Sequence, residues 1–256
     1  MYTIINLSFE SPRCFEEDWK KFEEKDVNNP VFKIVSLESE EAYGLETAKI
    51  LNGGEYVVRC EDDVMLVDNL WEKAWLLPLR EKEHINNFIC QLFYTHAVQQ
   101  HIIYFHSSLI DFYGQGIMFI GPSGIGKTTQ AELWNRYRGA VIINGDRVFV
   151  QETPEAFLGW GTPWHGSSPY CENTNVPVHA MIVLKQSPEN SIRELTGFEK
   201  VTSISNNVFY PTWLENGMEL CLETLDHLLT KIPVYELSCR PDEDAVKLTE
   251  ETIFGK

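Results

Sequence analysis

One glycine-rich stretch, GPSGIGKTT at residues 121–129, limits what this chain can fold into more than any other feature. It matches the pattern GxxxxGK[ST] at every required position, ending in Lys127 and Thr128. The apolar residues 116–120 predict a buried strand before it, and TTQAELWNRY followed by Gly139 predicts a helix with a glycine C-terminal cap. Between a strand and a helix, such glycines let backbone N–H groups turn toward phosphate oxygens. The stretch therefore predicts a nucleotide phosphate site.

The residue types of this stretch predict separate roles. Lys127 would contact the β- and γ-phosphates, and the Thr128 hydroxyl would bind Mg²⁺. The predicted nucleotide-binding residues are Gly121, Pro122, Ser123, Gly124, Ile125, Gly126, Lys127, Thr128 and Thr129. The alternative is a glycine turn with a solvated lysine, which is less favoured because pattern and flanking elements agree. The chain lacks NKxD, LSGGQ, HRD and DFG, which disfavours GTPases, ABC transporters and protein kinases.

A carboxylate follows the next apolar run, where VIINGDRVFV passes from a predicted strand into Gly145 and Asp146. P-loop proteins place a metal-binding or base residue at the end of the strand that follows the phosphate-loop helix. Asn-Gly-Asp is also good turn chemistry, so a plain surface turn is the alternative. The nearby phosphate loop favours the functional interpretation.

These residues together carry a family resemblance. The stretch FHSSLIDFYGQGIMFIGPSGIGKTT followed by AVIINGDRV resembles the HPr kinase/phosphorylase family and its smaller relatives, well over residues 102–150 and loosely beyond. The resemblance implies an α/β P-loop kinase domain with the fold that this family shares with phosphoenolpyruvate carboxykinases. It also implies transfer of the γ-phosphoryl group of ATP, with Mg²⁺, to a hydroxyl. Some small relatives resemble kinases of peptide serines, and others phosphorylate free serine.

The resemblance assigns catalytic roles to three residues. Asp146 would take the proton from the acceptor hydroxyl, His106 would be hydrogen-bonded to it, and Lys127 would neutralise charge in the transition state. Without the resemblance, a lone histidine after an aromatic strand is more often a core residue. Thr128, Asp146 and Glu172 form the predicted metal-binding set.

The chain departs from that family at one acid. Where the family commonly has two adjacent acids, this chain has Gly145 and Asp146, and either Asn144 or Glu172 could substitute for the missing carboxylate. The Arg-Gly-Leu-Gly segment associated with reverse phosphorolysis is also missing. We therefore expect a related kinase and not the bifunctional regulator.

A second loop, LGWGTPWHGSSPYCENTN at residues 158–175, combines flexible polar residues with Trp160, Trp164 and Tyr170. Related proteins have a similar Gly-Thr-Pro-Trp-His-Gly stretch. His165 and Glu172 could contact substrate or metal. An ordered loop whose aromatic side chains fill the core is an equal alternative.

The predicted elements divide the chain in two. Strand-like runs such as YTIINLSF, PVFKIVSL and EYVVRCEDDVMLVD, with the turn LNGGE, predict a smaller β-rich α+β domain over residues 1–95. The run REKEHINNFICQLFYTHAVQQH predicts a linking helix. Residues 96–256 would form the α/β kinase domain, in which VLKQSPENSIRELTG predicts a surface hairpin. Because the phosphate-binding residues all lie in the second part, we expect the first to recognise the acceptor.

Composition bears on partners and compartment. The net charge of -17 argues against a nucleic-acid partner, although one local site on an acidic protein can still bind a triphosphate. No apolar run reaches the ~18 residues of a membrane span, and residues 1–15 do not resemble a signal peptide. Six scattered cysteines without a CxxC pair are typical of reduced core residues. We expect a cytoplasmic protein without a membrane partner, and leave self-association open.

The sequence thus predicts an ATP-dependent kinase that acts on a hydroxyl, most simply a serine, of a peptide, protein or small molecule. A non-catalytic nucleotide-binding partner in a peptide-processing complex is the alternative, and Gly145 keeps it open. A simple ATP hydrolase is a weaker third interpretation.

Overall fold

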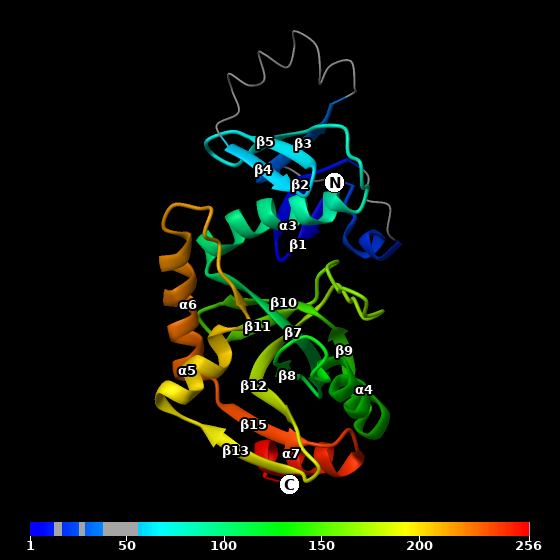
Figure 1. The fold of residues 1–256 in the computed structure, drawn as a ribbon, viewed down its shortest axis with the longest axis vertical. Coiled ribbons are helices and arrows are strands. Elements are labelled where there is room, and N and C mark those ends of the chain that lie inside the picture. The colour runs from blue at the N-terminus through cyan, green and yellow to red at the C-terminus, as the bar shows by residue number, and fades with distance from the viewer. Residues whose placement is uncertain (13–16, 26–28, 38–55, 256) are drawn as a thin grey trace. The chain divides into compact units, whose positions relative to one another are not determined.

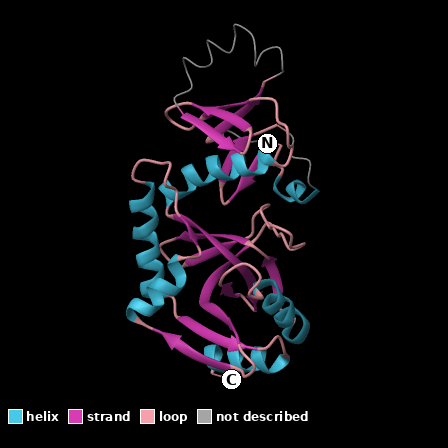
Figure 2. Ribbon diagram, in the orientation of Figure 1, coloured by secondary structure: helices cyan, strands magenta, loops and turns pink. Residues whose placement is uncertain are grey.

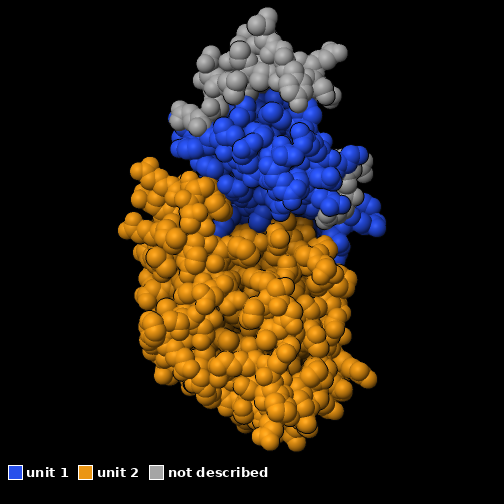
Figure 3. All heavy atoms as spheres, in the orientation of Figure 1, with its two compact units in different colours: residues 1–97 blue, residues 98–256 orange. Residues whose placement is uncertain are grey.

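The computed structural model describes residues 1–12, 17–25, 29–37 and 56–255. The chain divides into two compact units, Met1–Ala97 (unit 1) and Val98–Lys256 (unit 2), shown in different colours in Figure 3. Each unit contains its own sheet together with helices, so the protein is of mixed α/β class.

Unit 1 contains a six-stranded sheet in the order β1-β2-β3-β6-β5-β4. Its elements are β1 (Tyr2–Ile4), β2 (Leu7–Glu10), the 3-10 helix η1 (Glu17–Phe22), β3 (Phe32–Ser36), β4 (Tyr56–Cys60), β5 (Asp63–Val67), β6 (Lys73–Leu76) and α3 (His84–Ala97). The predicted linking helix is confirmed as α3, with its periodic apolar residues buried. The predicted turn LNGGE lies outside the described residues.

The run YTIINLSF, expected as one strand, is an antiparallel hairpin of β1 and β2. The chain reverses at Ile5 and Asn6, whose φ angles are 49° and 61°. Two successive positive φ angles form the turn that matches the twist of paired strands, and glycine or asparagine usually supplies them. An isoleucine in this conformation is uncommon, so the sequence carries little sign of the reversal.

Unit 2 is organised by a nine-stranded sheet with the main order β11-β10-β7-β8-β12-β15-β13 (Figure 1). Its strands are β7 (Ile102–Phe112), β8 (Gln115–Ile120), β9 (Val141–Asn144), β10 (Arg147–Glu152), β11 (Phe157–Trp160), β12 (Asn175–Gln186), β13 (Ser191–Leu195), β14 (Val208–Phe209) and β15 (Val234–Cys239). β9 and β14 each pair with β7. Strands β8, β12 and β15 run parallel, and the apolar runs of β8 and β12 are buried between neighbours on both sides.

The long strand β7 changes its partner midway. Its first half pairs with β10, with His106 opposite Arg147. Its second half pairs with β8, with Ser107 opposite Ile120. Two successive residues of one strand therefore lie beside the start of β10 and beside the end of β8.

The helices of unit 2 (Figure 2) pack against this sheet. They are the 3-10 helix η2 (Val98–Gln100), α4 (Lys127–Arg138), α5 (Gly197–Ser205), α6 (Gly217–Lys231) and α7 (Glu243–Phe254). The predicted helix after the glycine stretch is confirmed as α4, and Gly139 ends it with a φ of 69°. Ala131 and Trp134 of α4 share a buried cluster with Phe112 of β7 and Val246 of α7. This cluster fixes α4, and with it the glycine stretch, on the sheet.

The predicted hairpin around residues 187–190 is wrong, because β15 lies between β12 and β13. Arg193 of β13 accordingly donates to Glu236 of β15 as well as to Glu199. A strand that comes from about 40 residues further along the sequence leaves no local sign of this pairing.

In the described residues, no helix is both long and apolar enough to cross a bilayer.

Candidate active site

Residues 121–126 form the turn between β8 and α4. Gly121, Gly124 and Gly126 have φ angles of 148°, 77° and 114°. Side chains other than glycine are strained at such angles, by roughly 1–2 kcal/mol in the left-handed helical region. The first N–H groups of α4, which have no partners within the helix, start directly after this turn. The glycines thus permit a compact loop at a helix N-terminus, where an anion is favoured.

Lys127 is the first residue of α4, and it is only 6% exposed. Its Nζ donates to the carbonyl oxygens of Gly121 and Pro122, at 3.0 and 3.2 Å. Burial lowers the pKa of Lys127, and the negative charge of Asp146 partly opposes this. An ammonium has three N–H groups, of which these carbonyls use two. A phosphate at this position would accept the third and compensate a desolvated cation.

Two side-chain hydrogen bonds join the glycine stretch to neighbouring strands. The Thr128 hydroxyl donates to the carbonyl oxygen of Gly145 at 3.1 Å. The Ser108 hydroxyl of β7 donates to the carbonyl oxygen of Lys127 at 3.0 Å. The start of α4 is therefore attached to the turn that carries Asp146 and to the strand that carries His106.

Asp146 and His106 are in direct contact, with 3.1 Å between Oδ1 and Nε2. Each side chain is 27% exposed, so the pair lies at the surface of the site and not in the core. Arg147 Nε lies 3.5 Å from the other carboxylate oxygen. The hydrogen bond from His106 lowers the pKa of Asp146, and the charges of Arg147 and Lys127 lower it further, against the opposing effect of burial. The carboxylate is therefore held ionised, in position to accept a hydrogen bond.

Asn144 holds this turn to the loop that follows. It is fully buried, and its Oδ1 accepts from the N–H groups of Asp146 and Arg147, both at 2.9 Å. Its Nδ2 donates to the carbonyl oxygens of Thr162 and Trp164, both at 3.1 Å. These four bonds use the hydrogen-bonding capacity of the carboxamide. Asn144 is thus a structural residue, and its oxygen is not available to replace a missing acid as a metal ligand.

Ser168 occupies the space beside Gly145. A Cβ atom on Gly145 would lie 1.8 Å from Ser168 Oγ and 2.5 Å from Ser168 Cβ. Ser168 is buried, and its Oγ accepts from the N–H of Tyr170 at 3.2 Å. The position where the resembling family has a second acid is therefore closed to any side chain. Neither Gly145 nor Ser168 supplies a second carboxylate.

Gly166 lies directly against the Asp146 carboxylate. Its φ is 60°, and a Cβ atom there would lie 2.5 Å from Asp146 Oδ2. Both the backbone conformation and the close approach require glycine. Gly166 was not predicted as a site residue from the sequence, which pointed instead to its larger neighbours Trp164 and His165. A side chain at residue 166 would displace the carboxylate.

In the loop at residues 158–175, the aromatic side chains fill the core, as one of the two expectations had it, whereas contact of His165 or Glu172 with substrate or metal stays a prediction. Trp164 is buried, with its ring centroid 5.8 Å from that of Phe149, so it fills the core. His165 Nδ1 contacts the carbonyl oxygen of Ser168 within the same loop. The Tyr170 hydroxyl donates to Glu132 of α4 at 3.2 Å. The aromatic residues hold the loop in place, and the loop in turn presents Gly166 to the carboxylate.

Glu172, the remaining member of the predicted metal set, is not brought to this turn. The bridge between Asn144 and Cys171 places Glu172 opposite Ile143, and its N–H donates to Ile143 O at 2.9 Å. Ile143 lies within β9, whereas Asp146 lies in the turn beyond the end of that strand. Its side chain is exposed. Of the predicted metal set, Thr128 and Asp146 both adjoin Gly145, Thr128 by its hydrogen bond and Asp146 as the next residue in the chain. The described residues contain no cluster of three or more His, Cys, Asp or Glu side chains suited to a metal.

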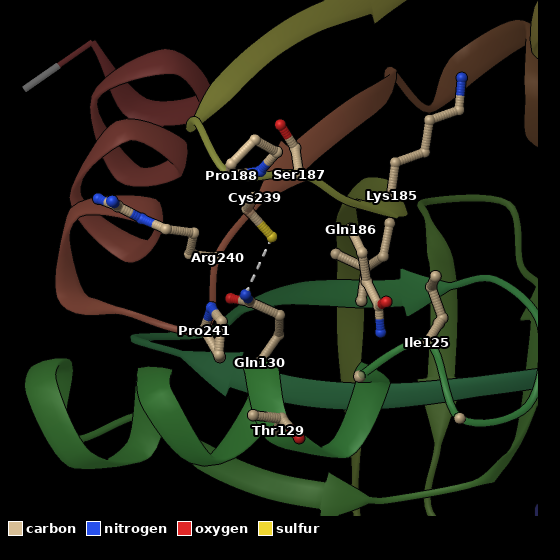
Figure 4. A pocket seen from close by; sticks show the side chains of 13 residues that line it. Ile125, Thr129, Gln130, Lys185, Gln186, Ser187, Pro188, Cys239, Arg240 and Pro241 are labelled. Atoms are coloured by element: carbon tan, nitrogen blue, oxygen red, sulfur yellow. Dashed lines mark hydrogen bonds between the residues drawn. The ribbon is translucent and has the colours of Figure 1, made fainter.

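A cavity of about 530 Å³ adjoins the glycine stretch (Figure 4). It is lined by the loop at residues 124–126, the first turns of α4, and the segments that follow β12 and β15. Its volume is within the usual range for small-molecule sites. The glycine stretch thus adjoins a cavity of the size that small molecules occupy.

Comparison with known proteins adds little to this description. No protein-family model matches the chain, and a search of curated proteins found no match. Among solved structures, the chain is similar to the Hpr(Ser) kinase/phosphatase from Coxiella burnetii, with a TM-score of 0.35 and 11% sequence identity. The alignment covers 58% of this chain and 95% of that one. At this TM-score the likeness does not establish a common fold or activity.

Proposed function

We propose that this protein is an ATP-dependent kinase of the HPr kinase-like type, which transfers the γ-phosphoryl group to the hydroxyl of a serine or similar acceptor. One observation carries the proposal: the Thr128–Gly145 hydrogen bond attaches the GxxxxGK[ST] stretch to the turn that presents the Asp146–His106 pair. A loop suited to phosphates and an ionised carboxylate suited to a hydroxyl therefore adjoin each other.

The proposed reaction needs little covalent chemistry from the protein. The acceptor oxygen forms a bond to the γ-phosphorus, the bond from that phosphorus to the β–γ bridging oxygen breaks, and ADP leaves. Asp146 receives the hydroxyl proton and later releases it to water. His106 orients the carboxylate, and Lys127 offsets the negative charge on the phosphoryl oxygens. A carboxylate with a lowered pKa is a weak base, which suits a loose transition state in which the proton moves late.

The residues present fit a magnesium nucleotide. Among the described residues, the buried ammonium of Lys127 donates to the carbonyl oxygens of Gly121 and Pro122, and an anion satisfies it better. Thr128 Oγ1 and one oxygen of Asp146 would hold Mg²⁺, either directly or through water. The ion would offset phosphate charge during transfer.

Replacing Lys127 with methionine is expected to weaken Mg²⁺-ATP binding by about 10–100-fold, as expected for loss of charged hydrogen bonds to phosphate. Methionine preserves most of the apolar stem. Isothermal titration calorimetry of both proteins measures the change. Lys247→Met, on the exposed face of α7, is the matched control and should bind as the wild type does. Equal affinities for wild type and Lys127→Met would remove the proposed phosphate site.

We further propose that unit 1 recognises the acceptor, since Lys127, Asp146 and His106 all belong to unit 2. Residues 98–256 produced alone should then bind Mg²⁺-ATP like the full chain but show a raised KM for the acceptor. The acceptor would be found by incubating the full chain with Mg²⁺-ATP and serine-containing candidates and detecting phosphorylation by mass spectrometry. An unchanged KM in the shortened protein would contradict a recognition role.

A second function, nucleotide binding without turnover as part of a peptide-processing complex, is favoured by one observation. Ser168 excludes a side chain at Gly145, so the turn carries a single carboxylate. Tight Mg²⁺-ATP binding without phosphate transfer to any candidate acceptor would support this alternative over the kinase.

A further inference from the structure

The cavity beside the glycine stretch has a mostly apolar boundary. Ile125 and Leu184 line it, together with Pro188 and Pro241 from the segments after β12 and β15. Figure 4 shows these segments facing each other across the space, with the first turns of α4 forming one side. An apolar lining of this kind suits an aromatic ring system.

One buried polar group lines this cavity without a complete set of partners. Gln130 of α4 is 3% exposed, and its Nε2 donates to Cys239 Sγ at 3.3 Å. Its Oε1 is buried and has no hydrogen-bond partner in the described structure. A buried acceptor left unsatisfied is unfavourable. Such a group at the edge of an apolar cavity indicates a ligand that supplies a donor.

We infer that this cavity is the nucleobase subsite and that Gln130 selects adenine through its exocyclic amino group. The inference rests on the proposal that residues 121–128 bind a nucleoside triphosphate. The cavity begins at Gly124 and Gly126, so a base in it is continuous with phosphates held at the glycine stretch. An adenine amino group would donate to Gln130 Oε1, whereas a base with a keto group at that position would place one acceptor against another.

The contact between Gln130 and Cys239 holds the carboxamide in the orientation that this selection uses. The thiol sulfur accepts from Nε2, and Oε1 is the end of the carboxamide that has no partner among the described residues. Burial raises the pKa of Cys239 to about 11, aided by the charge of Asp242 and against the hydrogen bond from Gln130. Cys239 is therefore a neutral thiol at pH 7 and acts as a positioning group.

The test compares three ligands, all with Mg²⁺: ATP, inosine triphosphate and inorganic tripolyphosphate. Inosine triphosphate carries a keto oxygen in place of the adenine amino group, and tripolyphosphate has no base. Wild type should bind ATP about tenfold or more tightly than inosine triphosphate. Gln130→Met should reduce this ratio to within about twofold, because it removes the acceptor. Tripolyphosphate should bind both proteins equally.

Gln115→Met, at the start of β8 and outside the cavity lining, is the matched control and should retain the wild-type ratio. Because the readout is a ratio within one protein, a modest loss of stability in Gln130→Met does not affect it. A wild-type ratio near one, or a ratio unchanged in Gln130→Met, would overturn the base subsite while tripolyphosphate binding sustains the phosphate site. Failure of wild type to bind either ATP or tripolyphosphate would overturn both proposals.

Discussion

Replacing Gly145 with aspartate is expected to destabilise the protein, although it restores the second acid of the family that the sequence resembles. The new Cβ would lie 1.8 Å from Ser168 Oγ, so the loop that carries Ser168 must move. Overpacking of a filled site typically costs about 1–3 kcal/mol. For a chain of this size, that lowers Tm by roughly 2–12 °C. Thermal unfolding followed by circular dichroism measures the change.

The rescuing variant is Gly145→Asp combined with Ser168→Gly, which removes both of the overlapping atoms. Its Tm should lie above that of Gly145→Asp. Ser168→Gly alone should lose about 1 kcal/mol, because the hydrogen bond from Tyr170 N is removed. Losses that simply add in the double variant would show that Ser168 does not determine the residue at position 145.

These two positions show where sequence reasoning reaches its limit in this protein. The missing acid at Gly145 is visible in the sequence, but the contact of Gly145 with Ser168, more than twenty residues further along, is not. The same holds for the contact of Gly166 with Asp146, to which the hydrogen bonds from Asn144 to the carbonyl oxygens of Thr162 and Trp164 contribute. Contacts between distant segments depend on strand register, which a local pattern does not encode.

Local elements with strong end signals were predicted well. The helix α4 follows the glycine stretch and ends at Gly139. Helical periodicity and glycine caps act over a few residues, so they are readable directly. The predicted hairpin around residues 187–190 was wrong because β15, which comes much later in the sequence, lies between β12 and β13.

In the candidate site, too, some residues were identified from the sequence and others were not. The glycine stretch, Asp146 and His106 were identified from residue types and resemblance, and the register of β7 with β10 brings the last two together. Glu172 was included in the predicted metal set as a carboxylate of the loop at residues 158–175, and the structure pairs its backbone with Ile143 of β9 and not with the turn of Asp146. The catalytic roles themselves stay predictions.

Replacing Asp146 with asparagine is expected to slow phosphoryl transfer by ~10²–10⁴-fold, the usual effect of losing a general base. Asparagine keeps the shape of the side chain and can still accept from His106, but it cannot take the proton. The affinity for Mg²⁺-ATP should change much less than the rate. Rates come from single-turnover assays, and Asp244→Asn on α7, with its exposed carboxyl, serves as the control. A large loss of ATP affinity would instead assign Asp146 mainly to metal binding.

His106→Ala tests whether the histidine acts through that carboxylate. The hydrogen bond from His106 is the largest cause that lowers the pKa of Asp146, so its loss returns that pKa toward the ordinary value of about 3.9. A base acts only when ionised, so the rate falls as pH drops through the pKa of Asp146. The acid side of the pH–rate profile should therefore move to higher pH in His106→Ala. The double variant should be little slower than Asp146→Asn alone, because both changes affect one unit. An unmoved profile together with additive losses would show that His106 is a packing residue of β7 and not a partner in proton transfer.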